Sequence, residues 1–164
     1  IDNSTWSLTG NGTYGEYQLN TNDNLDNFSL SLRFKIKSNA GVHESIISSD
    51  KNKPNGSWQI GMTGNTSIKF SSKQSSGDSS SKDLLLLKDT WHHLVLTKSN
   101  SNQVRIYTNN SLSETLQLNN WALNWLRIGT NRNTANFWKG NIDDVRIYDY
   151  VLSEDNINTL YQKY

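Results

Sequence analysis

One stretch, residues 28–37, restricts the fold of this chain more than any other. Its five apolar residues alternate strictly with five polar ones. Because successive side chains of a β-strand point to opposite faces, this pattern predicts a strand with one buried face and one wet face. Strands of this kind belong to antiparallel sheets that cover a core on one side.

The rest of the chain predicts more short strands separated by polar turns. We expect them at residues 6–8, 14–19, 45–48, 57–62, 67–71, 84–87, 91–98, 103–108, 112–118, 126–129 and 142–148. Asn109-Asn110 is predicted to form a tight hairpin turn, since Asn tolerates the left-handed backbone that such turns need. The Ser-rich residues 71–82 are predicted to form a mobile loop.

A short helix is predicted near the end of the chain, over residues 154–161. Ser153 can cap it, and Ile157 and Leu160 would face inward. Many short strands, one late helix and no βαβ rhythm predict an all-β fold, an antiparallel two-sheet β-sandwich with a short C-terminal helix. At 164 residues we expect a single domain over residues 1–164.

The two sheets of such a sandwich need a shared inner layer. The predicted members of this layer are Phe28, Leu30, Leu32, Phe34, Ile36, Trp91, Val95, Val104, Ile106, Val145 and Ile147.

Composition excludes several classes of function. The formal net charge is only +1, and no basic run occurs, so we expect no nucleic-acid partner. The chain has no Cys and therefore no disulfide, thiol nucleophile or Cys-ligated zinc. No apolar run is long enough to span a bilayer, so we expect no membrane insertion.

An acidic pair, Asp143-Asp144, lies at the start of the last predicted strand. Strict alternation would place Asp143 on one face with Val145 and Ile147, and that face should be buried. A carboxylate at the rim of a core needs a partner, either a cation or a set of hydrogen-bond donors.

Three segments together resemble the laminin-G-like jelly rolls of the concanavalin A-like lectin/glucanase superfamily. They are residues 28–34, residues 91–97 followed by 104–107, and residues 126–129 followed by 137–148 and the final helix. The resemblance implies a jelly-roll module of a larger secreted or cell-surface protein, located outside the cell and often glycan-binding. The chain departs from the family pattern at Asn109-Asn110, at Trp138, and at Trp121 and Trp125.

The resemblance also implies a structural calcium ion that ties the N-terminal loop to the last strand. Asp143 would be its main ligand, Glu16 could add a carboxylate, and the loop Gly10-Asn11-Gly12 could present backbone carbonyls. The alternative is that Asp143 accepts backbone N–H bonds from the same loop. Both interpretations stay open at this point.

Catalysis is not expected. The resembling superfamily includes glucanases, which carry their catalytic carboxylates on a strand of the form Glu-x-Asp-x-x-Glu. This sequence has no such motif. On a strand, the adjacent Asp143 and Asp144 diverge, and so do His92 and His93. We predict that His93 shares a face with Trp91 and Val95, and that both histidines lie in or near the sheet core.

Several aromatic and polar residues are candidates for a glycan site, because sugar CH faces stack on aromatic rings while polar side chains bond the hydroxyls. The candidates are Trp138, Arg132, Asn131, Asn136, Trp121, Trp125 and Trp58. We predict Trp138 to be exposed. Trp58 fits the core better, and Trp121 and Trp125 could equally form a lid over the sandwich edge.

The sequence thus predicts a noncatalytic carbohydrate-binding module whose partner is a polysaccharide or cell-surface glycan. A protein- or surface-adhesion module and a purely structural spacer are the alternatives.

Overall fold

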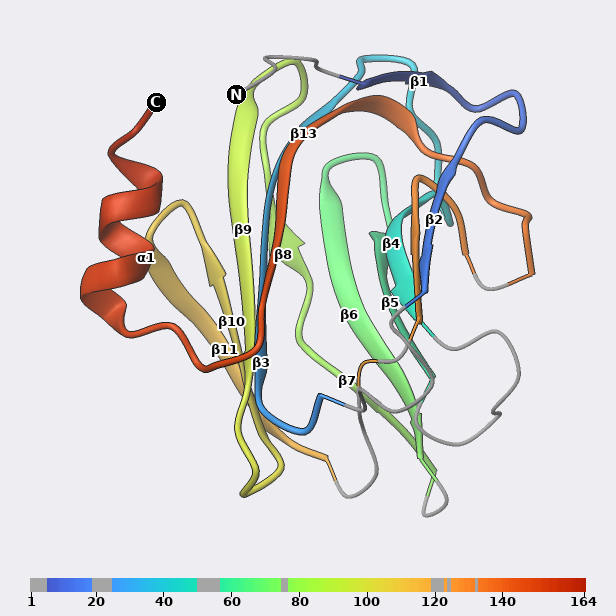
Figure 1. Cartoon of the computed structure of the whole chain (residues 1–164). Helices are drawn as coiled ribbons and strands as arrows, with labels where there is room; N and C mark the ends of the chain where they lie inside the picture. Colours follow the sequence, from blue (N-terminus) through green and yellow to red (C-terminus); the bar gives the residue numbers. More distant parts are fainter. Residues whose placement is uncertain are drawn as a thin grey trace.

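The structure is a computed structural model that describes residues 6–18, 25–49, 57–74, 77–118, 123, 125–131 and 133–164. Two antiparallel sheets pack face to face, and the helix α1 lies outside one of them (Figure 1). The predicted antiparallel β-sandwich with a short terminal helix is confirmed. Among the described residues, no helix has the length and apolar character needed to cross a membrane.

The first sheet has six strands. In spatial order they are β1 (Trp6–Thr9), β13 (Lys139–Tyr148), β3 (Phe28–Ile36), β9 (Trp91–Lys98), β10 (Gln103–Thr108) and β11 (Ser111–Gln117).

The second sheet has seven strands. In order they are β2 (Gly15–Gln18), β12 (Trp125–Ile128), β4 (Ser45–Ser49), β5 (Trp58–Met62), β6 (Ser67–Gln74) and β7 (Gly77–Ser80), with β8 (Leu84–Leu85) beside β6.

The core lies between the two sheets. The alternating residues of β3 supply its centre, as predicted, with Phe28, Phe34 and Ile36 fully buried. From the second sheet, Trp58 stacks on Phe70 with ring centroids 6.0 Å apart, so Trp58 belongs to the core. Most of the predicted inner layer is confirmed. The members that pack in this core are Phe28, Leu30, Leu32, Phe34, Ile36, Val104, Ile106, Val145 and Ile147.

The prediction was wrong for Trp91 and Val95. Leu94 and Leu96 of β9 face the core, so Trp91 and Val95 alternate to the outer face of the six-stranded sheet. Trp91 is only half-buried there. The outer face is not left open, because α1 covers part of it.

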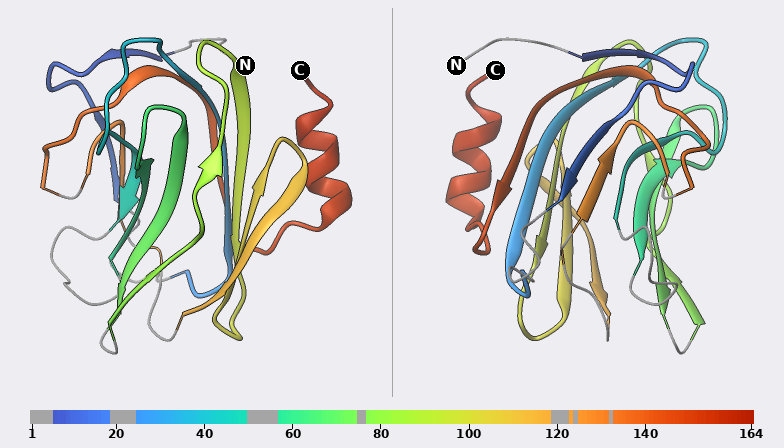
Figure 2. Two further views of the ribbon diagram at one scale, coloured as in Figure 1. Left: turned by 180° about the vertical axis from the view of Figure 1, so that it is seen from behind. Right: turned by 45° about the vertical axis from the view of Figure 1, so that its right-hand side comes forward.

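Helix α1 (Glu154–Tyr161) forms as predicted. The Ser153 hydroxyl accepts a hydrogen bond from the backbone N–H of Asn156, and the Asn156 side chain accepts one from the Ser153 N–H in return. This reciprocal cap satisfies N–H groups that a helix start otherwise leaves without partners. Ile157 and Leu160 are buried and form a second, smaller core against the sheet. Its other members are Val95, Tyr107, Leu152 and Tyr148. Figure 2 shows α1 lying along the outside of the six-stranded sheet.

The two turn predictions had different outcomes. Asn109 and Asn110 have φ of 50° and 66°, which confirms the left-handed hairpin turn. The Ser-rich loop prediction was wrong, because residues 71–74 and 77–80 pair as β6 and β7. Serine hydroxyls help to fix this hairpin: the Ser72 hydroxyl donates to the Ser57 carbonyl, and the Ser81 hydroxyl accepts from the Phe70 N–H.

Candidate functional site

A β-bulge in β13 builds the outer face beneath α1. Asp143 pairs with Arg33 and Arg146 pairs with Ser31, so two residues of β13 oppose one residue of β3. Asp144, in the bulge, has a left-handed φ of 49°. Partner residues across a ladder point to the same side, so Asp143 faces outward with Arg33. The prediction that Asp143 shares the buried face with Val145 and Ile147 was therefore wrong.

The bulge presents the Asp144 carboxylate to the C-terminal end of the chain. One carboxylate oxygen accepts from Arg146 Nε at 2.6 Å, and the other accepts from the Tyr164 hydroxyl at 2.5 Å. Burial together with the hydrogen bond to Asp144 raises the pKa of Tyr164. These contacts attach the end of the chain to the sheet.

Arg33 lies between two aromatic rings on this face. Its guanidinium carbon is 4.1 Å from the Tyr164 ring centroid and 5.0 Å from that of Trp91. The Lys35 ammonium is 5.3 Å from the Trp91 centroid. Cations favour the electron-rich faces of aromatic rings, so the rings hold the orientation of both side chains.

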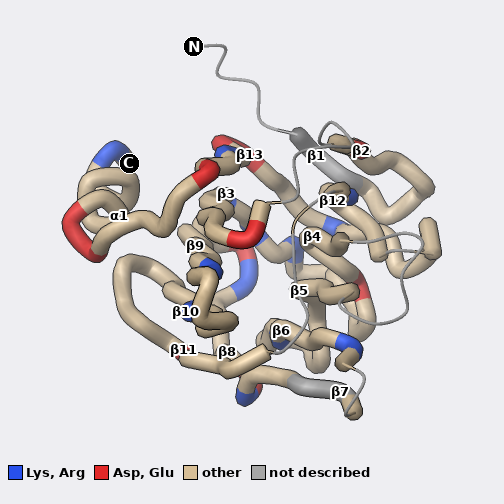
Figure 3. Tube along the Cα trace, turned by 60° about the horizontal axis from the view of Figure 1, so that its bottom comes forward, with Lys and Arg blue, Asp and Glu red and all other residues tan. Residues whose placement is uncertain are grey.

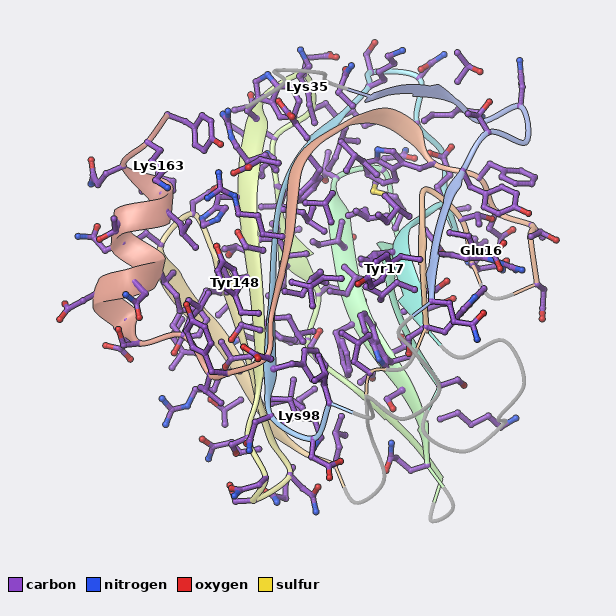
Figure 4. All side chains as sticks on the ribbon, in the orientation of Figure 1. Glu16, Tyr17, Lys35, Lys98, Tyr148 and Lys163 are labelled. Carbon is purple, nitrogen blue, oxygen red and sulfur yellow. The ribbon has the colours of Figure 1, made fainter. Side chains whose placement is uncertain are left out.

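A groove of about 240 Å³ opens between this face and the C-terminal end of α1. It is lined by Arg33, Trp91, His92, His93, Tyr161, Gln162 and Tyr164. Figure 4 shows Lys35 and Lys163 at the same end of the molecule, where α1 ends. Three aromatic rings, a guanidinium, an imidazole and an amide therefore meet in one concave place.

His93 forms the buried end of the groove and is only 4% exposed. Its Nε2 lies 2.9 Å from the Ser31 hydroxyl, and its ring is 6.0 Å from that of Tyr161. Burial, helped by the nearby positive charge of Arg33, lowers the pKa of His93 to about 4. The imidazole is therefore neutral at physiological pH.

His92 points to the opposite side of β9, as predicted. Its Nε2 lies 2.8 Å from the Leu87 carbonyl oxygen, and its Nδ1 lies 3.1 Å from the Asn109 side-chain nitrogen. The ring is 5.6 Å from that of Phe34. The two histidines do not act as a pair.

Trp138, predicted to be exposed, is instead fully buried. Its ring meets that of Phe34 edge-on at 6.0 Å. Gly140 makes room for the indole, because a Cβ at that position would lie 2.4 Å from Trp138 Nε1. A buried ring offers no face to a ligand, and the same holds for Trp58.

Three of the remaining predicted glycan residues are described, and they lie on or near the seven-stranded sheet. Trp125 is on its outer face, where the indole N–H donates to Glu16 Oε1 at 3.1 Å and Arg127 lies 4.5 Å from the ring. Asn131 is buried, and its side-chain oxygen accepts the N–H groups of residues 133 and 135, which shapes the loop. Asn136 is exposed. Trp121 and Arg132 lie outside the described residues.

The predicted calcium ligands do not come together. Glu16 is on the seven-stranded sheet, 3.4 Å from Arg127 Nη2, whereas Asp143 is on the outer face of the other sheet. Figure 4 places Glu16 on the side of the molecule away from α1. Gly10 packs against the aliphatic side chain of Lys139, Gly12 faces open space, and Asn11 is exposed beside them. In the described part of the chain, no three His, Asp or Glu side chains form a group that could hold a metal. These residues therefore do not fit one calcium site.

A buried glutamate that the sequence did not single out makes the expected link to the last strand. Glu44 is 5% exposed and accepts the N–H of Lys139 at 2.9 Å and the N–H of Gly41 at 2.8 Å. The Lys139 ammonium lies 3.4 Å from the same carboxylate. Since Gly10 rests on Lys139, the N-terminal turn, β13 and the segment before β4 meet here.

Sequence reasoning also missed the groove residues Arg33, Trp91, Tyr161 and Tyr164. Two features of the sequence could have indicated the groove. The polar face of β3 carries Arg33 and Lys35, and the apolar side of α1 must pack on some part of a sheet. In Figure 3 acidic residues mark the first turn of α1, basic residues lie near the C-terminus, and charges of both signs are scattered over the described residues.

Two antiparallel sheets packed face to face in this way are consistent with a jelly-roll sandwich. A family model described as the concanavalin A-like lectin/glucanases superfamily, of the laminin G type, matches residues 9–158. The chain belongs to this family, as the resemblance implied. No curated protein matches the chain.

The solved structures with the same fold include receptor-binding domains of botulinum neurotoxins. The receptor-binding domain of neurotoxin D superposes with a TM-score of 0.77 at 19% identity, covering 97% of this chain and 43% of the other. The ligand-binding domain of botulinum neurotoxin serotype D in complex with N-acetylneuraminic acid superposes with a TM-score of 0.73 at 20% identity. The match covers 97% of this chain and 41% of that one. The chain thus spans about two-fifths of those chains, and at this identity the likeness shows the fold alone.

Proposed function

We propose that this chain is a noncatalytic lectin-like domain that binds a glycan in the groove between α1 and the six-stranded sheet. One observation carries the proposal: Trp91, Tyr161 and Tyr164 meet Arg33 and His93 in one concave place. Sugars present apolar CH faces that pack on aromatic rings, and hydroxyls that bond to polar side chains.

The size of the groove limits what enters it. Its volume of about 240 Å³ is below the ~300–1,000 Å³ typical of pockets for drug-sized ligands. We infer that one sugar unit of a longer glycan enters and that the rest of the chain stays in solvent. This suits a polysaccharide or a cell-surface glycan.

The family supports the proposal, since its description includes lectins. A solved structure of the same fold is a ligand-binding domain with bound N-acetylneuraminic acid, although this chain corresponds to only 41% of it. The receptor-binding neighbours also support an extracellular or cell-surface location and membership of a larger protein.

The geometry of the carboxylates supports a noncatalytic role. Glycosidases need two carboxyl groups about 5–9 Å apart on either side of the scissile bond. At the groove, Asp144 is already bonded to Arg146 and Tyr164, and Asp143 accepts the N–H of Asp144 at 2.8 Å. Both carboxylates therefore support the bulge and do not face a shared substrate position.

The test is a glycan array screened with the wild type, Trp91→Ala and a matched control, Tyr17→Ala. Tyr17 is 48% exposed and lies on β2, in the seven-stranded sheet, whereas the groove lies on the six-stranded one. We expect Trp91→Ala to weaken binding at least tenfold, about 1.4 kcal/mol, and Tyr17→Ala to leave it unchanged. Absence of glycan binding, or equal binding by the Trp91 variant, would contradict the proposal.

A second candidate, protein adhesion, is favoured by a different surface. Leu85 and Leu87 are 80% and 70% exposed, beside Leu84 and Leu86, which are buried. If adhesion is the role, Leu85→Ser with Leu87→Ser should abolish cell binding that persists after glycans are removed enzymatically.

A further inference from the structure

The buried end of the groove has a hydrogen-bonding capacity that the protein itself does not use. His93 Nδ1 has no hydrogen-bond partner in the part of the chain that the structure describes. The other ring nitrogen, Nε2, faces the hydroxyl of Ser31, which is 1% exposed. A buried polar atom without a partner costs free energy, so its presence beside a groove points to a ligand.

Proton accounting decides what kind of group Nδ1 needs. If Nε2 carried the proton and donated to Ser31, the Ser31 hydroxyl hydrogen would find no acceptor among the described residues, and Nδ1 would also stay unsatisfied. If Ser31 donates to Nε2, only the Nδ1–H of His93 lacks a partner. The second arrangement leaves fewer buried groups unsatisfied, so His93 presents an N–H donor.

The charges around this donor favour a negative ligand. Arg33 lines the groove, and Lys35 lies over Trp91 at its edge. Of the two carboxylates on this face, Asp144 is engaged by Arg146 and the Tyr164 hydroxyl, and Asp143, opposite Arg33, accepts the Asp144 N–H. Arg33, Lys35 and Arg146 together outnumber them. The guanidinium carbon of Arg33 lies 5.0 Å from the Trp91 ring centroid and 4.1 Å from that of Tyr164, so the two rings hold Arg33 at the groove. A guanidinium binds carboxylate and sulfate oxygens through its forked N–H groups.

We propose that the groove selects glycans by an anionic substituent, a carboxylate or a sulfate, that accepts hydrogen bonds from Arg33 and from His93 Nδ1–H. The inference rests on the proposed function and adds the class of sugar: a uronic-acid or sulfated unit, with its apolar face against Trp91. A hydroxyl of a neutral sugar could also accept from His93, but it would bring no negative charge to Arg33.

The test compares three oligosaccharides of equal length by titration calorimetry. One ends in glucuronic acid, one in a sulfated glucose and one in neutral glucose. We expect one of the acidic ligands to bind at least tenfold more tightly than the neutral one. Arg33→Met keeps the aliphatic stem and should remove this preference, while Arg105→Met, an exposed arginine on β10 of the same sheet, should preserve it.

If Arg33→Met does not fold by circular dichroism, Arg33→Lys replaces it. That variant keeps the charge but loses the forked N–H geometry, so the preference should fall severalfold. In the free protein, ¹⁵N NMR of the imidazole should show a protonated Nδ1 and an unprotonated Nε2 for His93. The reverse tautomer would overturn the inference.

Two further outcomes separate this inference from the function on which it rests. Equal binding of neutral and acidic oligosaccharides, lost in Trp91→Ala, would overturn the inference and leave the lectin role intact. Binding of no oligosaccharide would overturn both. Inorganic sulfate competing as strongly as the sulfated oligosaccharide would also overturn the inference, because recognition would then be of the ion alone.

Discussion

Removal of the Trp138 side chain should cost the fold a large part of its stability. The residue is fully buried and packs edge-on against Phe34 at 6.0 Å. Truncation of a buried Trp to Ala costs about 3–5 kcal/mol, as the sum of lost burial and the cavity left behind. Since domains are stable by about 5–15 kcal/mol, Trp138→Ala should lose a substantial fraction of the free energy of unfolding.

The measurement is urea unfolding followed by circular dichroism, because Trp fluorescence would be dominated by the other five tryptophans. Trp138→Phe retains an aromatic ring and should lose clearly less stability than Trp138→Ala. Gly140→Ala tests the same packing from the other side: its Cβ would lie 2.2 Å from the Lys35 carbonyl oxygen and 2.4 Å from Trp138 Nε1, so we expect it to prevent folding or destabilise severely.

A loss below about 1 kcal/mol in Trp138→Ala, the range of surface substitutions, would refute the reasoning. If the same variant also lost glycan binding, Trp138 would be the exposed ligand contact that the sequence pattern predicted. Glycan binding that survives in Trp138→Phe, with reduced stability, is the result that the structure predicts.

Three further predictions concern the charges of the fold. Glu44→Gln should lower the free energy of unfolding by about 1–3 kcal/mol, because its amide NH₂ would face the backbone N–H of Lys139 or Gly41. An unchanged midpoint of urea unfolding would contradict the role of Glu44 in holding β13. The contribution of His93 to the free energy of unfolding should be fully present above pH 6.5 and fall towards pH 4, because the unfolded chain protonates His93 near 6.5 and the folded chain only near 4. His93→Gln should show a smaller fall of stability over this pH range. An equal fall in the variant and the wild type would contradict the prediction. Because Asp143 and Glu16 lie on different sheets, chelation of calcium should leave the melting temperature unchanged, and a fall of several degrees would support the calcium prediction.

Elements governed by local physics could be predicted from the sequence. Strict alternation in residues 28–37 identified β3 and its buried face, because the period of two follows directly from strand geometry. Ser153 identified the start of α1, and Ile157 and Leu160 identified its inner side. Asn109-Asn110 identified a hairpin because few other residues tolerate left-handed backbone at both positions.

Features that depend on distant contacts could not be predicted. The bulge at Asp144 puts Asp143 on the outer face while Val145 and Ile147 face the core. The pattern of apolar and polar residues around Asp144 does not indicate the extra residue. Trp138 stands among polar neighbours, and its burial depends on the space that Gly140 leaves beside β3. The groove exists only because α1 returns to cover the outer face, a contact between residues far apart in sequence.

The location of the glycan contact tests the central claim most directly. We suggest a ¹H–¹⁵N NMR titration with a glycan that the array identifies, since it reports on each backbone and indole N–H group separately. The account predicts that shifts concentrate at Trp91, His93 and Tyr161, including the Trp91 indole N–H. Shifts concentrated instead at Trp125 and Glu16, on the seven-stranded sheet, would contradict it.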